Sequence, residues 1–171
     1  INGKYVGYSQ GSKTPAEFDV SEFIEEGENL IAIQMYRWSD ASYLESQDML
    51  RMSGIEREVY IYKRPKVSIS DLNVIADLDN FFDNGIFKSS IEVVNNTNTN
   101  ATRVLKVQLV YNEIEIFNIE KTININSYDS VMVDTKTIVE AVKQWSAETP
   151  NCYKLNIQLI DEEEEVNNQF I

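Results

Sequence analysis

The chain has 171 residues, of which 43% are hydrophobic, so it can bury a core in one or two small domains. Asp and Glu outnumber Lys and Arg by 28 to 15, and the net charge of −13 disfavours nucleic acids and anionic membranes as partners. The chain has no histidine and a single cysteine, Cys152, which excludes histidine-based triads, histidine zinc sites and an intrachain disulfide. No apolar run approaches the roughly 18 residues of a membrane span.

The first part of the chain combines strand-like runs with few helical signals. An Asn2-Gly3 turn signal precedes an alternating segment at 4–8, and further β-type runs follow at 29–37 and 59–62. Ser21 is a possible N-cap for at most one helical turn. Because the sequence begins within a strand-like run and has no leader segment, we expect it to come from the middle of a longer protein.

A long polar connection at 38–57 interrupts this pattern, and connections of this length are usually functional or packed against another part of the protein. Pro65 then marks a change to regularly spaced strand candidates. We therefore predict two domains, residues 1–64 and residues 65–171.

The second domain is predicted to be an all-β sandwich. Asn95–Asn100 is expected to form a polar tip, and 137–144 is expected to form a short helix. The acidic run 161–165 is interpreted as a solvated hairpin end rather than a calcium loop. The turn before residue 86 contains Asp83-Asn84-Gly85, which tolerates positive φ. The predicted strands are 67–76, 86–94, 103–111, 114–125, 130–137, 152–160 and 166–171. This size and strand number match an immunoglobulin-like sandwich without the antibody disulfide.

Several long strings of residues go beyond fold class. They are 2–19 (NGKYVGYSQGSKTPAEFD), 27–30 (GENL), 37–49 (RWSDASYLESQDM), 53–55 (SGI) and 145–155 (WSAETPNCYKL). The first four strings resemble the last part of the N-terminal jelly-roll, the sugar-binding domain, of the large β-galactosidases of glycoside hydrolase family 2. The fifth resembles the entry to a late strand of that family's first immunoglobulin-like domain.

The resemblance implies that the chain is an N-terminal, non-catalytic region of a retaining β-galactosidase. The family's acid/base and nucleophile glutamates belong to a TIM barrel that would follow this chain, so the fragment alone is expected to be inactive. Its partner would be a β-galactoside bound through that barrel. The resemblance implies no cofactor for the fragment, and sodium and magnesium for the whole enzyme.

Asp40 is the one residue that the resemblance places in the active site. The aspartate of the Trp-Ser-Asp string in the family projects beside the barrel, where it helps to bind the galactosyl group and a sodium ion. A carboxylate can accept sugar hydroxyls and can also ligate a hard cation. The alternative is that Asp40 only caps a loop turn. In the isolated chain we expect little or no binding.

Other loop residues have structural interpretations. Trp38 is predicted to be a buried anchor rather than a sugar-stacking platform, and Trp145 is predicted to pack over the sandwich core. Tyr5 and Tyr8 are interpreted as core or rim residues. Hydrogen-bonded pairs that hold the long connection are expected among Arg37, Glu45, Asp48, Arg51 and Arg57.

Four positions depart from the family pattern. Ala41 stands where glycine is expected, and it would be strained if the loop requires positive φ. Leu50 and Glu56 replace aromatic residues, which affects packing against the barrel or the substrate pocket. Cys152 replaces a leucine and is predicted to be a small buried apolar group.

Two other functions stay open at this point: an independent carbohydrate-binding module, and an immunoglobulin-like adhesion or scaffold domain. An incomplete jelly-roll would also expose strand edges, which predicts a homodimer through those edges. The protein is expected to be soluble and bacterial, and its compartment, cytoplasm or periplasm, is not determined.

Overall fold

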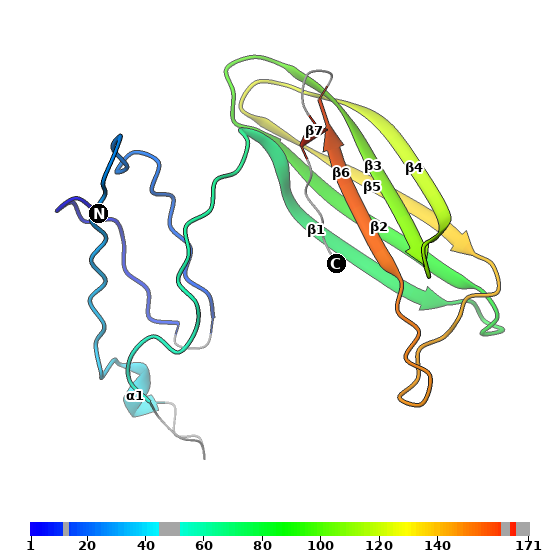
Figure 1. Cartoon of the computed structure of the whole chain (residues 1–171), viewed down its shortest axis with the longest axis horizontal. Coiled ribbons are helices and arrows are strands. Elements are labelled where there is room, and N and C mark those ends of the chain that lie inside the picture. Colours follow the sequence, from blue (N-terminus) through cyan, green and yellow to red (C-terminus); the bar gives the residue numbers. More distant parts are fainter. Residues whose placement is uncertain (12–13, 45–51, 162–164, 167–171) are drawn as a thin grey trace. The chain divides into compact units, whose positions relative to one another are not determined.

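The structure, a computed structural model, describes residues 1–11, 14–44, 52–161 and 165–166. The chain divides into two units, Ile1–Ile61 (unit 1) and Tyr62–Ile171 (unit 2). Figure 1 shows unit 2 as a set of long strands and unit 1 as extended segments with one short helix. The described residues contain no helix with the length and apolar character that a membrane span requires.

The described residues of unit 1 contain one regular element, the helical turn α1 (Ala41–Leu44). Its described residues form no strand, so the strands predicted at 4–8, 29–37 and 59–62 are wrong. The physical reason is the lack of partners, because extended segments form a sheet only when their N–H and C=O groups pair with a neighbour. A jelly-roll uses eight strands of about five to six residues each plus their turns, and unit 1 is too short to supply them.

Side-chain amides hold unit 1 together instead. Asn2 Nδ2 donates to Phe23 O (2.9 Å) and to Asn29 Oδ1 (2.8 Å), and Leu30 N donates to Asn2 Oδ1 (2.9 Å). The turn that precedes Phe23 is capped by Asp19, whose Oδ1 accepts from the backbone N–H of Ser21 at 2.9 Å. Asp19 therefore takes the capping role predicted for Ser21.

Unit 2 is a sandwich of two antiparallel sheets. One sheet has the order β1-β2-β5 and the other has the order β4-β3-β6-β7. Among the described residues the strands are β1 (Val67–Leu78), β2 (Gly85–Asn95), β3 (Ala101–Tyr111), β4 (Ile114–Ile125), β5 (Asp129–Val139), β6 (Lys154–Ile160) and β7 (Glu165–Val166). This arrangement confirms the predicted all-β, immunoglobulin-like fold.

At the end of the fold, one predicted element is wrong and another lies mostly outside the described residues. The helix predicted at 137–144 is wrong, because Thr137 and Ile138 belong to β5 and Ala141 has a φ of 47°, which ends any right-handed helix. The final strand was predicted to span 166–171. The structure describes β7 as Glu165–Val166, and residues 167–171 lie outside the described part.

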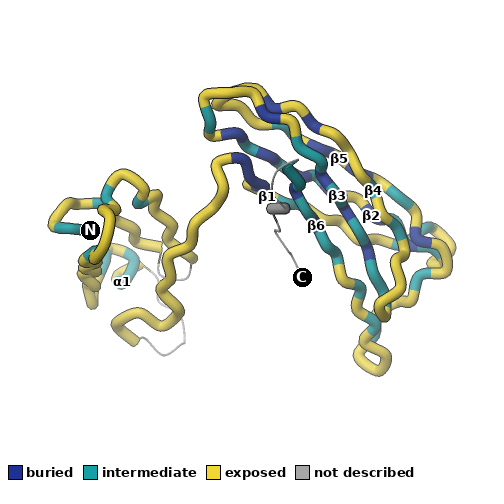
Figure 2. The backbone as a smooth tube through the Cα atoms, turned by 45° about the horizontal axis from the view of Figure 1, so that its top comes forward, coloured by how far each residue is buried: buried dark blue, intermediate teal, exposed yellow. Residues whose placement is uncertain are grey.

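The core of unit 2 follows the two-residue period of its strands. Alternate residues of β2 and β3 are buried, and the dark blue of Figure 2 is confined to unit 2. Ile91, Val93, Val107, Ile157 and Leu159 have no exposed surface. The sequence pattern therefore produces a core because each strand meets a second sheet.

Asn95 is a buried polar hub at one end of the sandwich. Its Nδ2 donates to Thr99 O (2.8 Å) and Asn126 O (3.0 Å), and its Oδ1 accepts from Thr97 Oγ1 (2.6 Å) and Thr97 N (3.0 Å). One side chain thus fixes the β2–β3 and β4–β5 connections together. The prediction that Asn95–Asn100 is a polar tip is wrong for Asn95, which has no exposed surface.

The β1–β2 connection at the other end is organised by Asp79. Its Oδ2 accepts from Asn84 Nδ2 (2.8 Å), and its Oδ1 accepts from the backbone N–H groups of Phe81 and Asp83, both at 3.1 Å. These bonds, with Asn84 as the largest contributor, lower the pKa of Asp79. The positive φ falls on Phe82 (61°) and not within the predicted Asp83-Asn84-Gly85 segment.

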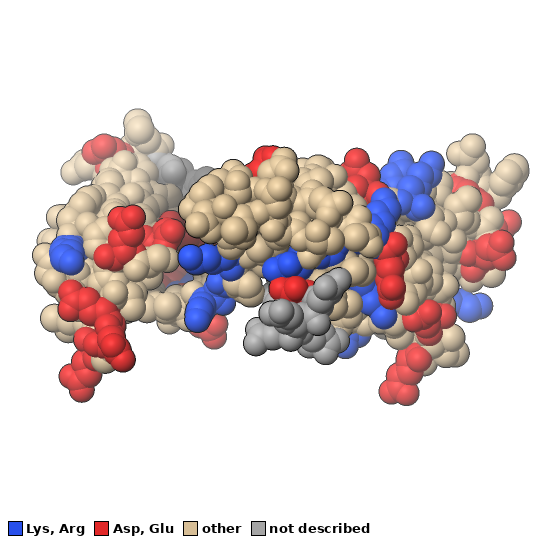
Figure 3. All heavy atoms as spheres, turned by 90° about the horizontal axis from the view of Figure 1, so that it is seen from above, with Lys and Arg blue, Asp and Glu red and all other residues tan. Residues whose placement is uncertain are grey.

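Acidic and basic side chains are interspersed on the molecular face drawn in Figure 3. Some cations are paired: Arg103 contacts Asp161 at 2.6 Å and Lys106 contacts Glu120 at 3.4 Å. Lys121 Nζ donates to the backbone carbonyl of Asp134 on β5, the edge strand of its sheet. Unit 2 thus uses a lysine to satisfy part of an exposed sheet edge.

Candidate functional site

The Trp38-Ser39-Asp40 segment leads directly into α1, and its backbone is fixed by two serines. Ser42 N donates to Ser39 O (3.0 Å), and Tyr43 N donates to Asp40 O (3.2 Å). In return, Ser39 N donates to Ser42 Oγ (3.0 Å), which is half of a capping box. The turn is therefore held by the serines, and sequence reasoning missed their pairing, although Ser at both ends of a four-residue turn is a known capping signal.

The Asp40 side chain is exposed. Among the residues that the structure describes, no hydrogen bond or ion pair of its carboxylate is present, and Ser42 rather than Asp40 supplies the cap. The geometry therefore disfavours the interpretation of Asp40 as a loop cap. A free carboxylate of this kind can accept several hydrogen bonds from sugar hydroxyls.

A metal ion would need more ligands than Asp40. Sodium and magnesium are hard cations that are bound by several oxygen atoms. The described part of the chain contains no group of three His, Cys, Asp or Glu residues that could hold a metal ion. Asp40 could contribute one oxygen to a sodium or magnesium site, and the other ligands would have to be other oxygen atoms.

Ala41 is not strained. It begins α1 and is not among the non-glycine residues with positive φ. The condition under which alanine would be strained at this position is therefore not met, because the local backbone is helical rather than left-handed.

Most aromatic residues of unit 1 are exposed, although Phe23 is half-buried. Trp38 is 62% exposed, and the guanidinium carbon of Arg37 lies 5.4 Å from the centre of its ring. Tyr5 and Tyr8 are also exposed, so neither is a core residue of unit 1. The prediction that Trp38 is a buried anchor is wrong for the described structure, because unit 1 builds no core that could bury it.

The predicted pairs of the long connection are tested only in part. Glu45, Asp48, Leu50 and Arg51 lie outside the described residues. Arg37 stacks on Trp38, and Glu56 and Arg57 are exposed.

Trp145 and Cys152 lie in the connection between β5 and β6. Trp145 forms a bridge with Pro150 and is 65% exposed, so the prediction that it packs over the core is wrong. Cys152 is an exposed free thiol, so the prediction of a buried apolar group is also wrong. Within this connection Ser146 N donates to Thr149 O (3.0 Å).

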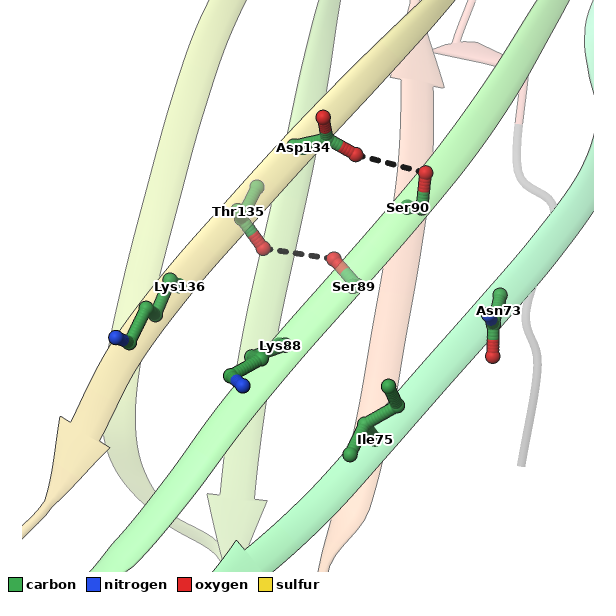
Figure 4. A pocket seen from close by; sticks show the side chains of 8 residues that line it. All are labelled: Asn73, Ile75, Lys88, Ser89, Ser90, Asp134, Thr135 and Lys136. Atoms are coloured by element: carbon green, nitrogen blue, oxygen red, sulfur yellow. Dashed lines mark hydrogen bonds between the residues drawn. The ribbon is translucent and has the colours of Figure 1, made fainter.

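The outer face of the β1-β2-β5 sheet carries a shallow hollow of about 310 Å³, drawn in Figure 4. Within it, Ser90 Oγ donates to Asp134 Oδ1 (2.7 Å), and the hydroxyls of Ser89 and Thr135 are 2.7 Å apart. The hollow is lined by Asn73, Ile75, Lys88, Ser89, Ser90, Asp134, Thr135 and Lys136. It contains one carboxylate, whereas retaining glycoside hydrolysis needs two.

Comparisons with known proteins agree with this two-unit organisation. Residues 1–65 match the model of the glycosyl hydrolases family 2 sugar binding domain, and residues 67–170 match the model described as glycosyl hydrolases family 2. The chain belongs to glycosyl hydrolase family 2. These matches confirm the resemblance noted in the sequence, and they assign residues 1–65 to the sugar-binding domain although the described residues of unit 1 form no sheet.

The curated family 2 relatives are much longer than this chain. It is 42% identical over 161 residues to a β-galactosidase of Priestia megaterium, covering 93% of the chain and 16% of that protein. It is 40% identical over 169 residues to a β-galactosidase of Photobacterium profundum, covering 95% of the chain and 16% of that protein. The chain thus spans about a sixth of these relatives.

Solved structures support the fold. A family 2 member from Bacteroides cellulosilyticus matches with a TM-score of 0.53 at 14% identity, over 58% of this chain and 14% of that one. A calcium-binding mutant of Bacteroides uniformis β-glucuronidase 2 matches with a TM-score of 0.51 at 17% identity, over 56% and 12%. At these identities the likeness concerns the fold alone.

Proposed function

We propose that this chain is the non-catalytic sugar-binding and immunoglobulin-like region of a retaining enzyme that hydrolyses terminal β-galactosides. The observation that carries the proposal is the 42% identity to a β-galactosidase over nearly the whole chain, which accounts for only 16% of that enzyme. The acid/base and nucleophile glutamates belong to the part of the enzyme outside this chain.

In this proposal Asp40 contacts the galactosyl group. Its exposed carboxylate has no described partner, and the serine-capped turn presents it without using it structurally. It accepts hydrogen bonds from sugar hydroxyls, and in the whole enzyme it also supplies one oxygen to a bound sodium ion whose other ligands come from outside the described residues. Asp40 is thus a substrate-binding residue, not a catalytic acid or base.

Unit 2 acts in this proposal as a rigid spacer between domains. Its β1–β2 connection is joined to the residues after β5, because Gln144 Nε2 donates to Phe82 O (2.6 Å) and Val142 N donates to Asp83 O (3.2 Å). This joined end exposes Phe81, Phe82 and Trp145. An exposed aromatic group on a fixed backbone is suited to contact another domain.

The test is a chimera of the Priestia megaterium β-galactosidase in which the matching segment is replaced by this chain. Because hydrogen bonds to a charged group contribute about 1.5–3 kcal/mol, Asp40→Ala should lower kcat/KM for a β-galactoside about tenfold to a hundredfold. It should also reduce the dependence of activity on sodium. Glu28→Ala, which removes another exposed carboxylate of unit 1, is the matched control and should leave both values unchanged. Equal activities of the two variants would contradict the role of Asp40.

We also propose that the isolated chain associates through unit 1. Its extended segment 29–37 exposes Leu30, Ile31, Ile33 and Tyr36 without a strand partner among the described residues. Sedimentation velocity should show a dimer that Ile33→Lys weakens. A monomer at all concentrations would contradict this proposal.

A further inference from the structure

The two sheets of unit 2 have different outer faces. On the β4-β3-β6 sheet the outward polar groups are paired, because Lys106 contacts Glu120 at 3.4 Å and Asn156 Nδ2 donates to Gln108 Oε1 at 3.0 Å. Neither β3 nor β6, both of which the structure describes in full, carries a large exposed hydrophobic side chain. The outer face of the β1-β2-β5 sheet differs in both respects.

Two lysines lie directly opposite each other on the outer face of the β1-β2-β5 sheet. Lys88 of β2 pairs with Lys136 of β5 in the strand register, and both line the hollow of about 310 Å³ drawn in Figure 4. Both side chains are exposed, and neither forms an ion pair with a carboxylate of the described residues. Like charges at directly opposite positions of neighbouring strands repel each other. An anionic group bound between the two lysines would therefore relieve a repulsion that the sheet itself leaves in place.

The carboxylates on the same face of the sheet have local hydrogen-bond partners. Asp134, which lies two residues from Lys136 on β5, accepts from Ser90 Oγ at 2.7 Å. Glu92 accepts from a serine hydroxyl of β1 at 2.7 Å. Asp71 and Asp77 each accept from the backbone N–H group of the residue that follows, at 2.9 and 2.8 Å. The lysine pair therefore leaves a place for a carboxylate that comes from another molecule.

Apolar side chains lie next to the lysine pair and give a second, independent indication. Ile86 of β2 is directly opposite Ile138 of β5, and Ile75 of β1 is directly opposite Lys88. Ile138 is 63% exposed and Ile75 is 48% exposed. Exposed apolar groups beside charged ones are typical of surfaces that bind other proteins. A free inorganic anion would gain nothing from these isoleucines, whereas a protein segment with an acidic and an apolar side chain would contact both features.

We propose that the outer face of the β1-β2-β5 sheet is a docking surface for an acidic protein segment. One carboxylate of that segment lies between the ammonium groups of Lys88 and Lys136, and a neighbouring apolar side chain covers Ile75 and Ile138. Charge complementarity at contact distance identifies the partner as acidic. The net charge of −13 does not prevent this contact, because salt screens distant charges beyond about 8 Å at physiological ionic strength.

Nuclear magnetic resonance of the 171-residue chain tests the docking with the peptide acetyl-Leu-Glu-Leu-amide as the probe. The titration is made at physiological ionic strength and at a protein concentration at which sedimentation shows a monomer. The peptide should shift the resonances of Lys88, Lys136 and Ile75 saturably. Acetyl-Ser-Glu-Ser-amide should bind several times more weakly, because it buries less apolar surface. Unchanged resonances at these three residues, or equal binding of the two peptides, would overturn the proposal.

Matched substitutions test the contribution of the lysine pair. The double variant Lys88→Gln with Lys136→Gln should weaken binding of the leucine peptide about tenfold, because each exposed ion pair contributes a modest factor. Lys154→Gln, which removes an exposed lysine from β6 in the other sheet, is the control and should leave the affinity unchanged. If the double variant does not fold, Lys136→Gln alone should give a smaller loss of the same kind. Equal losses for Lys136→Gln and Lys154→Gln would contradict a specific site.

Competition with inorganic phosphate separates an acidic protein segment from a simple anion as the occupant. Phosphate at the same concentration as the leucine peptide should displace little of it, because phosphate makes no contact with the isoleucines. Displacement of most of the peptide would show a general anion site and would overturn the proposal. None of these results depends on whether the protein binds a galactoside, so the docking surface and the function proposed above can fail separately.

Discussion

Units 1 and 2 contain similar β-type sequence runs and form very different structures. In unit 2, β3 pairs with β4 and β6, and its alternate residues are buried against the opposite sheet. In unit 1, the run 29–37 has the same kind of composition, yet most of it is exposed and it pairs with no strand among the described residues. An apolar period of two residues therefore indicates that a segment is able to join a sheet. Whether the sheet forms depends on partner strands from other parts of the sequence.

Turn chemistry sharpens the contrast. Unit 1 contains the favourable Asn2-Gly3 turn, with φ values of 51° and 76°, but no sheet follows it. Unit 2 joins β3 to β4 through Asn112 and Glu113, with φ values of 47° and 67°, although glutamate is unfavourable in this conformation. In both units, the local turn preference therefore does not decide whether a sheet forms. Burial against other strands decides it.

The largest predicted difference compares two isoleucines. Ile157 in unit 2 has no exposed surface, whereas Ile33 in unit 1 is 54% exposed. Ile157→Ala should lower the free energy of unfolding by about 3–4 kcal/mol, and Ile33→Ala should change it by less than about 0.5 kcal/mol. Chemical denaturation followed by circular dichroism measures both values, at a protein concentration at which sedimentation shows the chain to be monomeric. A large effect of Ile33→Ala would break the comparison, because it would reveal a core in unit 1.

The next effect concerns the polar hub of unit 2. Asn95→Ala removes the bonds to Thr97, Thr99 and Asn126, and it leaves buried groups without partners. We expect a loss of about 2–3 kcal/mol in the free energy of unfolding. Asn118→Ala, at an exposed position of β4, is the control and should be nearly neutral. Similar losses for the two variants would show that the hub does not stabilise the sandwich.

A smaller effect of opposite sign is expected at the β3–β4 turn. Glu113→Gly should raise the free energy of unfolding by about 0.5–1 kcal/mol, because glycine adopts positive φ without the steric cost of a side chain. Thermal unfolding measures the gain. Gly3→Glu makes the reverse change in unit 1 and should not alter the unfolding of unit 2. A destabilising Glu113→Gly would mean that chain entropy outweighs the relief of strain.

The smallest effect is a difference in pH dependence. Hydrogen bonds lower the pKa of Asp79 in unit 2, from Asn84 first, and the pKa of Asp19 in unit 1, from Ser21 first. A lowered folded-state pKa contributes stability that is present above the unfolded pKa, about 3.9, and is lost as pH falls through the folded value. Asp79→Asn should therefore make the melting temperature of unit 2 depend less on pH below about 4. Asp19→Asn should leave the pH dependence of the melting temperature of unit 2 unchanged. If Asp19→Asn changed it as Asp79→Asn does, the unfolding of the two units would be coupled.

Much of the sandwich could be predicted from sequence, because its strands are long and alternate with short turns. The residues that were wrongly predicted have partners that no local pattern reveals. Phe82 adopts positive φ because Asp79 and Gln144 fix the loop around it, and Asn95 is buried because two loops converge on its amide. Trp145 is exposed in a connection whose backbone is closed locally by the bond from Ser146 N to Thr149 O.

The candidate site could be predicted only through resemblance. A lone aspartate in a polar connection carries no chemical signal by itself, and Asp40 was singled out by the Trp-Ser-Asp string. In the structure, the adjacent turn is capped by Ser39 and Ser42. The Asp40 carboxylate therefore does not stabilise the turn through any described contact. The rest of a sugar site could not be predicted, because its other residues would lie in the part of the family 2 relatives that this chain does not match.

Isothermal titration of the 171-residue chain with galactose in sodium buffer tests the central claim most directly. The account predicts no saturable heat at millimolar galactose, because Asp40 alone cannot hold a sugar without the remainder of the enzyme. Saturable binding that disappears in Asp40→Ala would contradict it, because the chain would then be a self-sufficient carbohydrate-binding module.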